Sequence, residues 1–310
     1  MRGLRENGLA KVASGETSLA DVARATGLGA GARSARLAGA RRMTVVPRMR
    51  PLGRGTDHVA YLADGDLVVR CVEGGDPTGV VREADVLAAV AEVSPLPVPR
   101  PVRVDPDKGC LAYERLPGVA LLEVAPAARA AQASSVAGAV GGLVRALHAV
   151  PLDRAGELVD VDDFSPREWL REATQHYART SHAIPARHRP AVEAFVEAAP
   201  PRAPDVLALA HNDLGIEHVL VDPETLQVTG VIDWADAAIA DPARDVALLY
   251  RDLGPAALDA CAGGADEALL GRARFHARCG LLEDLAYGLE ENRRPYVDKS
   301  LLALAWLFPA

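Results

Sequence analysis

The sequence contains few cysteines, and they are widely separated. Cys71, Cys110, Cys261 and Cys279 form no Cys-x-x-Cys pair, and none has a histidine at the spacing of a zinc site. Small secreted domains and structural zinc modules normally show such spacing. We therefore expect neither disulfides nor structural zinc, and a reducing, cytoplasmic location.

Long apolar runs are missing as well. The sequence has no stretch of about 18 uninterrupted apolar residues, the length that crosses a bilayer. Its first residues, Met1 to Asn7, lack the apolar core of an export signal. Aromatic residues make up only 4% of the chain and hydrophobic residues 49%. We expect a soluble globular protein without a membrane partner, whose 310 residues can form one two-lobed domain or two ordinary domains.

Charge is unevenly spread along the chain. That segment has eight basic and three acidic residues, so residues 44–310 carry a net charge of −13 within a total of −8. An acidic body favours cationic small molecules and argues against nucleic acid as the main partner. Ser18 to Gly27 resembles the first half of a helix-turn-helix, but the sequence after Gly27 is a poor recognition helix. We expect residues 1–43 to be a basic extension, helical or disordered, with DNA binding as the alternative.

Two carboxylates stand at opposite ends of a predicted hairpin. An apolar approach leads into His211-Asn212-Asp213, a short strand follows at 219–221, and a second at 228–232 leads into Asp233. Two like charges in one small volume are unfavourable unless a cation or a reacting proton lies between them. The pattern therefore indicates chemistry at this hairpin.

These residues resemble the active-site signature of the aminoglycoside and macrolide phosphotransferases, distant relatives of protein kinases. The matching elements are His211, Asp213, His218, the Ile-Asp-Trp sequence around Asp233, and Asp241-Pro-Ala-Arg-Asp245. The resemblance implies an α+β, protein-kinase-like two-lobed fold. A small antiparallel-sheet lobe with one helix would occupy residues 44–118, and a larger, mainly helical lobe residues 119–310.

The same resemblance implies roles for the signature residues. Asp213 would orient an acceptor hydroxyl and take its proton, while His211 braces the loop and Asp245 clamps it from behind. His218 and Asp233 would hold Mg²⁺, with Mn²⁺ as an alternative ion. The residues that rim the mouth and are candidates for acceptor contacts are Glu217, Asp236 and Asp241.

His218 stands where most members of the family have asparagine, which is most similar to the macrolide 2′-phosphotransferase branch. Imidazole nitrogen favours Mn²⁺ over Mg²⁺ more than an amide oxygen does. If His218 coordinates the ion directly, activity should fall below about pH 6.5, where an unperturbed imidazole gains a proton. If it acts through a bound water, the pH dependence should be shallow.

The nucleotide site is predicted in the smaller lobe. A glycine-rich turn between two strands, containing Gly53, Gly55 and Thr56, can approach phosphates closely. Arg70 stands where kinase-like folds place a lysine on the phosphates, and Glu83 on the next helix is its expected partner. At the hinge, the main chain of Glu114 and Leu116 would contact the base of ATP or GTP, which the sequence does not distinguish.

Periodicity gives the remaining elements. Alternating and short apolar runs predict strands at residues 48–52, 59–62, 67–72, 102–105 and 110–113. Helical spacing predicts helices at 80–90, 127–150 and 190–199, a capped helix from Ser165, and two or three helices within 265–308.

The resulting hypothesis is a small-molecule kinase that moves the γ-phosphate of ATP or GTP to a hydroxyl of an antibiotic-like acceptor of the macrolide or aminoglycoside type, conferring resistance. A metabolic kinase for an amino sugar, choline or homoserine is one alternative. A catalytically weak nucleotide-binding module is another, because this chain departs from the family pattern at Arg70 and His218. The oligomeric state is left open.

Overall fold

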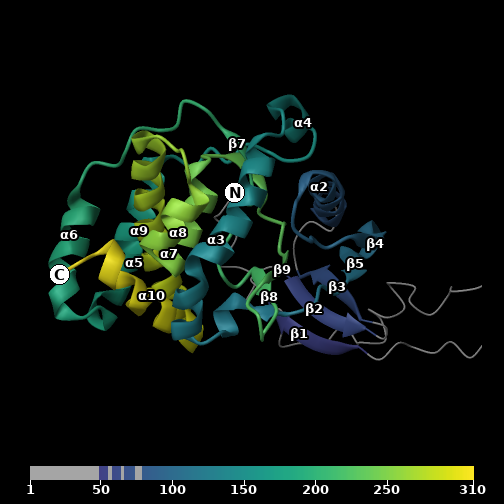
Figure 1. Ribbon diagram of the computed structural model, residues 1–310, viewed down its shortest axis with the longest axis horizontal. Coiled ribbons are helices and arrows are strands. Elements are labelled where there is room, and N and C mark those ends of the chain that lie inside the picture. Colours follow the sequence, from purple (N-terminus) through teal and green to yellow (C-terminus); the bar gives the residue numbers. More distant parts are fainter. Residues whose placement is uncertain (1–48, 55–57, 64–65, 74–78) are drawn as a thin grey trace, which may run out of the picture. The chain divides into compact units, whose positions relative to one another are not determined.

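The computed structural model describes residues 49–54, 58–63, 66–73 and 79–310. Within this part the chain divides into two compact units (Figure 1). Unit 1 contains the described residues up to Ala91 together with Pro99–Arg115, and unit 2 contains Glu92–Val98 and Leu116–Ala310. The predicted basic extension, and Gly55 and Thr56 of the glycine-rich turn, lie outside the described residues.

Unit 1 is built on a five-stranded antiparallel sheet with the strand order β1-β2-β3-β5-β4. The central strand β3 places Val69 and Cys71 on one face and Val68 and Arg70 on the other, as the alternation of side chains along a strand requires. The strands are β1 Arg50–Arg54, β2 His58–Ala63, β3 Leu67–Val72, β4 Pro101–Asp105 and β5 Cys110–Glu114.

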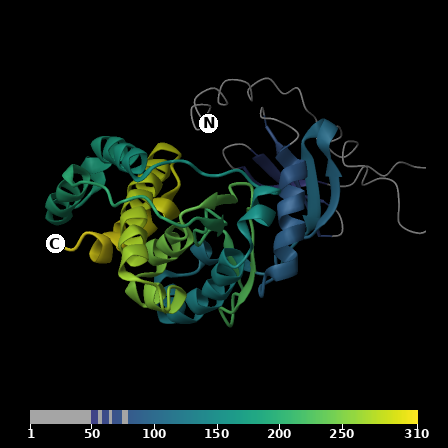
Figure 2. The same cartoon turned by 90° about the horizontal axis from the view of Figure 1, so that it is seen from above.

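One helix, α2 (Gly79–Val93), runs beside this sheet in Figure 2. Its buried residues, Val80, Ala84, Leu87 and Val90 among them, recur every three or four positions. That spacing forms one apolar stripe, which a helix buries against a sheet. Glu83 lies in the same stripe and is buried with it.

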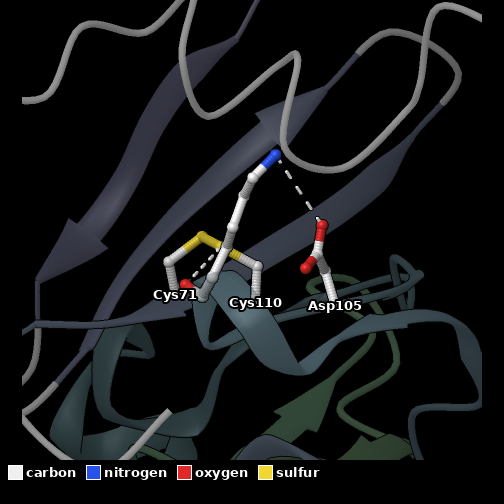
Figure 3. The surroundings of a disulfide bond; sticks show 4 residues. Cys71, Asp105 and Cys110 are labelled. Atoms are coloured by element: carbon white, nitrogen blue, oxygen red, sulfur yellow. Dashed lines mark hydrogen bonds and ion pairs between the residues drawn. A yellow bond between two sulfur atoms is a disulfide. The ribbon is translucent and has the colours of Figure 1, made fainter.

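A disulfide joins β3 to β5 within unit 1 (Figure 3). Cys71 and Cys110 are direct cross-strand partners in the antiparallel register, with Cα atoms 4.2 Å apart. The expectation that the chain has no disulfides was therefore wrong. Their separation of 39 residues carries no spacing signal, because the pairing arises from strand register. Cys261 and Cys279 are free and buried.

Reducing this disulfide is expected to lower the thermal stability of unit 1. A cross-link that closes a loop of this length stabilises a protein by up to about 4 kcal/mol in the chain-entropy account. Thermal unfolding with and without a thiol reductant measures the effect. Cys110→Ser should unfold at the lowered temperature with and without reductant. A reductant-induced shift in that variant equal to the shift of the unmodified protein would contradict the assignment.

Unit 2 is mainly helical. The long helix α9 packs against α5, α7 and α10, and α3 packs against α7 and α8. Its α-helices are α3 Pro126–His148, α4 Leu152–Gly156, α5 Pro166–Thr180, α6 Arg189–Glu197, α7 Ala243–Leu253, α8 Pro255–Cys261, α9 Glu267–Glu290 and α10 Arg294–Leu307. In the described part of the chain, none of the helices has the length and apolar character needed to cross a membrane.

The start of α5 shows how the sequence sets a helix boundary. The side chain of Ser165 accepts a hydrogen bond from the amide of Glu168, and the Glu168 carboxylate accepts one from the amide of Ser165. Pro166, which has no amide hydrogen to satisfy, occupies the first turn. This capped start was predicted from the sequence.

Five short strands of unit 2 form and flank the predicted hairpin. β6 (Val119–Ala120), β8 (Val219–Val221) and β9 (Val228–Val231) form one antiparallel sheet, and β7 (Ala208–Ala210) pairs with β10 (Ala238–Ala240). Gly118, at the start of β6, has φ +105°, and a Cβ there would lie 2.5 Å from the Val221 carbonyl oxygen. Only glycine allows the chain this close to the hairpin.

Candidate active site

The loop between β7 and β8 is hydrogen-bonded to a buried carboxylate. The two oxygens of Asp245, in the first turn of α7, accept hydrogen bonds from the amides of His211 and Asn212, both at 2.9 Å. Asp245 has 0% exposed surface, and hydrogen bonds from amides to a buried carboxylate are among the stronger ones. This contact fixes the start of the loop to α7.

His211 connects the loop to the segment that follows β9 and carries Asp233. Its Nε2 donates to the Ile232 carbonyl oxygen at 3.0 Å, and its Nδ1 accepts from the Asp213 amide at 3.3 Å. Its ring packs against buried Trp234 with 4.5 Å between centroids. A neutral imidazole with its proton on Nε2 satisfies both bonds, so His211 braces the main chain on both sides of the site.

His218 lies between the two carboxylates. Its Nδ1 donates to the Asp213 carbonyl oxygen at 2.8 Å, and its Nε2 lies 3.7 Å from Oδ2 of Asp233. Oδ2 of Asp213 is 3.6 Å from Nδ1. A histidine that donates one ring N–H to a carbonyl presents its other nitrogen to a metal, and here that nitrogen faces Asp233.

Charge and burial act in opposite directions on this histidine. Burial lowers the pKa of His218, but the carboxylates of Asp213, Asp233 and Glu217 outweigh it and raise this pKa to about 9. Partial desolvation, with Glu217 and Asp236 nearby, raises the pKa of Asp213, while His218 acts in the opposite direction. The metal-free site therefore holds a proton on His218 at neutral pH, and the expected pH boundary near 6.5, which assumed an unperturbed imidazole, moves upward.

Two site residues have left-handed backbone conformations. Asn212 and Asp233 both have φ +67°, in the region that non-glycine residues seldom occupy. Such conformations cost free energy and persist where the surrounding structure over-determines them. Here the bonds of Asp245 to Asn212 and of His211 to Ile232 impose that constraint.

A divalent metal ion fits this site if the protein and a nucleotide share its coordination. No group of three or more His, Cys, Asp or Glu side chains within the described ranges is arranged to hold a metal by itself. His218 and Asp233 instead offer one nitrogen and one carboxylate. Mg²⁺ in phosphoryl-transfer enzymes is often bound by one or two carboxylates, with phosphate oxygens and water completing its shell. The donor set fits an ion that arrives with a nucleotide.

The three acceptor-contact candidates lie in different environments. Asp236 is exposed and close enough to influence the charge of Asp213. Glu217 is turned inward, where Lys299 Nζ lies 2.7 Å from its carboxylate. Asp241 is buried and accepts hydrogen bonds from the Ala243 amide and the side chain of Arg272. Glu217 and Asp241 therefore do not rim a mouth, because their carboxylates are engaged inside unit 2.

Sequence reasoning missed the side chains that hold Asn212. Its side-chain amide donates to Asp162 at 3.0 Å, and its side-chain oxygen accepts from Arg244 at 3.2 Å. The Arg244 guanidinium stacks over Trp169, 3.9 Å from the ring centroid. Arg244 lies inside the Asp-Pro-Ala-Arg-Asp motif, so its position was visible, but its target 32 residues away was not.

In unit 1, Arg70 and Glu83 form a buried ion pair. Nη1 of Arg70 lies 2.5 Å from Oε1 of Glu83, and Nη2 lies 3.2 Å from Nδ1 of His58. Gly53 lies at a register shift in β1, where a Cβ would meet no atom within 4 Å. Glu114 ends β5, and Leu116 is the first residue after the passage into unit 2.

A model of the phosphotransferase enzyme family matches residues 48–279. The chain belongs to this family. It is 33% identical over 178 residues to an aminoglycoside 3′-phosphotransferase of Streptomyces fradiae, covering 51% of this chain and 59% of that protein. It is 30% identical over 214 residues to the streptomycin 3″-kinase of Streptomyces griseus, covering 64% of this chain and 75% of that protein. The chain thus spans about three fifths of the first relative.

Solved structures of phosphotransferases show the same fold. The GDP complex of a wild-type aminoglycoside 2′-phosphotransferase matches with TM-score 0.60 and 19% identity, covering 83% of this chain and 91% of that chain. A macrolide 2′-phosphotransferase from Brachybacterium faecium matches with TM-score 0.54 and 26% identity over the same shares. The predicted family and the kinase-like α+β fold, with an antiparallel sheet in one unit and mainly helices in the other, are confirmed.

Proposed function

We propose that this protein is a small-molecule kinase that transfers the γ-phosphate of ATP or GTP to a hydroxyl of a cationic, antibiotic-like acceptor. The observation that carries the proposal is the placement of His218 between two carboxylates. Nε2 faces Asp233, and the side chain of Asp213 stays 46% exposed. One carboxylate is thus available to a substrate, and the other is paired with a metal-binding nitrogen.

In the proposed reaction, a bond forms between the acceptor oxygen and the γ-phosphorus as the bond to the nucleoside diphosphate breaks. Asp213 orients the acceptor hydroxyl and takes its proton, and His218 and Asp233 hold the divalent ion. That ion, when bound, neutralises charge on the phosphates. Arg70, oriented by Glu83, contacts phosphate oxygens. Such transfer depends mainly on positioning and electrostatics, which the bonds from Asp245 and His211 supply.

Exposed carboxylates support a cationic acceptor. Asp236 follows the catalytic hairpin, and Asp160 and Asp163 lie on a segment that hydrogen-bonds with Ile239 of β10. Asp162 in the same segment holds Asn212, next to Asp213. Exposed carboxylates attract amine-bearing molecules. Solved relatives with kanamycin, gentamicin and streptomycin provide the comparison that favours an antibiotic, and resistance by modification is the biological role we propose.

The nucleotide and the compartment are also part of the proposal. Structural relatives are complexes with GDP and with ADP, so both ATP and GTP are retained as donors. A cytoplasmic location stays a prediction. The Cys71–Cys110 disulfide argues against it, because disulfides are uncommon in reducing compartments. Trapping free thiols at the moment of cell lysis would measure how much of the disulfide is formed in the cell.

The proposal predicts phosphorylation of at least one amine-bearing antibiotic. The purified protein is incubated with ATP or GTP, Mg²⁺ or Mn²⁺, and a panel of aminoglycosides, macrolides and hydroxylated metabolites, and each product is scored for the mass of one added phosphate. Asp213→Asn, which preserves side-chain size, serves as the inactive control. Phosphate gain on choline, homoserine or an amino sugar alone would favour a metabolic kinase. Nucleotide binding without transfer to any acceptor would favour the catalytically weak module.

A further inference from the structure

Five charged side chains behind the catalytic loop form a buried group that the proposed mechanism does not use. We call it the buried charge cluster: Glu217, Arg251, Asp252, Asp284 and Lys299. They come from the loop and from helices α7, α9 and α10, and their side chains are between 1% and 13% exposed. The cluster lies entirely within unit 2.

Lys299 is the centre of this cluster. Its Nζ lies 2.7 Å from Glu217, 2.9 Å from Asp284 and 3.3 Å from Asp252. Arg251 forms a forked pair with Asp252, with both hydrogen bonds at 2.8 Å. Three carboxylates and two cations are therefore arranged so that each cation meets more than one carboxylate.

Burying this many charges does not by itself stabilise a fold. The loss of hydration can exceed the attraction between the charges, and apolar side chains of similar volume often serve stability as well or better. A role in fixing one particular conformation explains buried polar groups better than a role in overall stability does. The conformation that this cluster touches is that of the loop leading to His218.

Two contacts join the cluster to that loop. Oδ2 of Asp252 accepts a hydrogen bond from the Ile216 amide at 3.2 Å, and Glu217, the next residue, is bonded by Lys299. A Cβ on Gly215 would lie 2.4 Å from the Glu217 carboxylate, so the glycine leaves room for the inward turn of this side chain. His218 follows directly, and its amide donates to the Gly215 carbonyl oxygen at 3.0 Å.

We propose that Lys299 and Asp252 are positioning residues for the metal site. They fix the main chain at residues 216–217, which directs Nε2 of His218 toward Asp233. This inference rests on the proposed function, because it concerns the metal that the reaction requires. Neither residue touches the reacting atoms. Their effect reaches the site through the peptide that precedes His218.

The pKa of Asp284 is consistent with a cluster in which opposite charges are balanced around Lys299. Burial, together with Glu217 and Asp252, raises the pKa of Asp284 to about 7, against the opposing effect of Arg251 and Lys299. Burial lowers the pKa of Lys299 and of Arg251, but the surrounding carboxylates outweigh it and raise both pKa values, so these two side chains stay charged. Asp284 pairs with Arg251 and Lys299, and among the described residues it makes no hydrogen bond to the loop. Asp284→Asn therefore offers a comparison within the same cluster for Asp252→Asn.

The test compares metal binding in Lys299→Met with that in a control that also loses a cation from the helices of unit 2. Arg278→Met removes a cation of α9 that donates to the Leu307 carbonyl oxygen and lies outside the cluster. Mn²⁺ binding in the presence of ADP is measured by calorimetry on the full chain, together with melting temperature and kcat. Changes to residues that orient a metal ligand typically weaken metal binding 10- to 100-fold.

Lys299→Met and Asp252→Asn are expected to raise the Kd for Mn²⁺ by about 10-fold, while the nucleotide KM changes little. Lys299→Arg should restore part of the affinity, and Asp284→Asn should change it less than Asp252→Asn. Arg278→Met should lower the melting temperature and leave the Mn²⁺ Kd unchanged. If Lys299→Met does not fold, Glu217→Gln keeps Lys299 paired with two carboxylates and must still raise the Kd.

A folded Lys299→Met or Glu217→Gln protein that binds Mn²⁺ as tightly as the unmodified protein overturns the positioning inference and leaves the proposed function intact. An unmodified protein that binds no Mn²⁺ with nucleotide and phosphorylates no acceptor overturns both. An equal loss of Mn²⁺ affinity in Arg278→Met would show that the effect follows stability, which also overturns the inference.

Discussion

Asp213→Ala is expected to lower phosphoryl transfer by about two to four orders of magnitude, the usual contribution of a positioned general base. Its carboxylate is 46% exposed beside His218, whereas the carboxylate of Asp233 faces the nitrogen that would bind a metal. In the proposed reaction, Asp213 contacts the acceptor rather than the triphosphate. Nucleotide affinity should therefore stay within a few-fold, so the loss appears in kcat at saturating nucleotide.

Asp236→Ala is the matched control for this substitution, because it removes an exposed carboxylate that acts on Asp213 only through its charge. It should leave turnover within about an order of magnitude and should mainly weaken binding of a cationic acceptor. Steady-state kinetics on the acceptor found in the panel separate the two variants. Turnover in Asp213→Ala equal to that of the unmodified protein would remove Asp213 from its assigned role.

The elements with strong local patterns were predicted well. The strand at residues 67–72 agrees with β3 at both ends, and the helix predicted at 80–90 lies inside α2. Ser165 was placed correctly as a helix cap because its partner Glu168 is only three residues away. In each case the signal lies within a few residues of the element it defines.

Features that depend on distant partners could not be predicted in the same way. The pairing of Cys71 with Cys110 follows from strand register, which the separate strand patterns do not specify. Helix α7 (Ala243–Leu253) was not predicted as a helix, although its charged residues recur on one face of the helix. That face is buried, and several of its charges pair with residues that lie far away in the sequence.

The site shows the same division between motif and surroundings. The positions of Asp213, His218 and Asp233 were named from the motif, and the structure brings them together. The direction of Glu217 was not foreseen, because its partner Lys299 lies 82 residues later in the sequence. A short motif gives residue identity and spacing, while the orientation of each side chain depends on the helices that surround it.

Metal binding at His218 is expected to release a proton and to strengthen as pH rises toward 9. In the metal-free protein, burial lowers the pKa of His218, but Asp213 and Asp233 together have the larger effect and raise this pKa to about 9. An unfolded histidine titrates near 6.5. The protonated ring thus stabilises the metal-free fold fully below about pH 6.5, and this contribution disappears as pH rises through 9. A metal ion that takes the Nε2 lone pair must displace that proton.

Three variants separate direct coordination by His218 from simple packing beneath the loop. His218→Asn should keep activity, shift preference from Mn²⁺ toward Mg²⁺, and lose the pH dependence of metal binding, because an amide oxygen is a hard ligand that does not titrate. His218→Ala should raise the metal concentration for half-maximal activity. His188→Ala is the control, since His188 is buried elsewhere in unit 2 and hydrogen-bonds the Phe308 carbonyl oxygen.

Calorimetry in two buffers of different ionisation enthalpy measures the protons released as Mn²⁺ binds. Direct coordination predicts close to one proton per ion at pH 7 for the unmodified protein and for His188→Ala, and none for His218→Asn. Coordination through a water would leave the proton on His218, so Mg²⁺ and Mn²⁺ would serve equally and release would be small. If His218→Ala titrates with metal like the unmodified protein, His218 is not a ligand, and Asp233 must hold the ion with the phosphates and water alone.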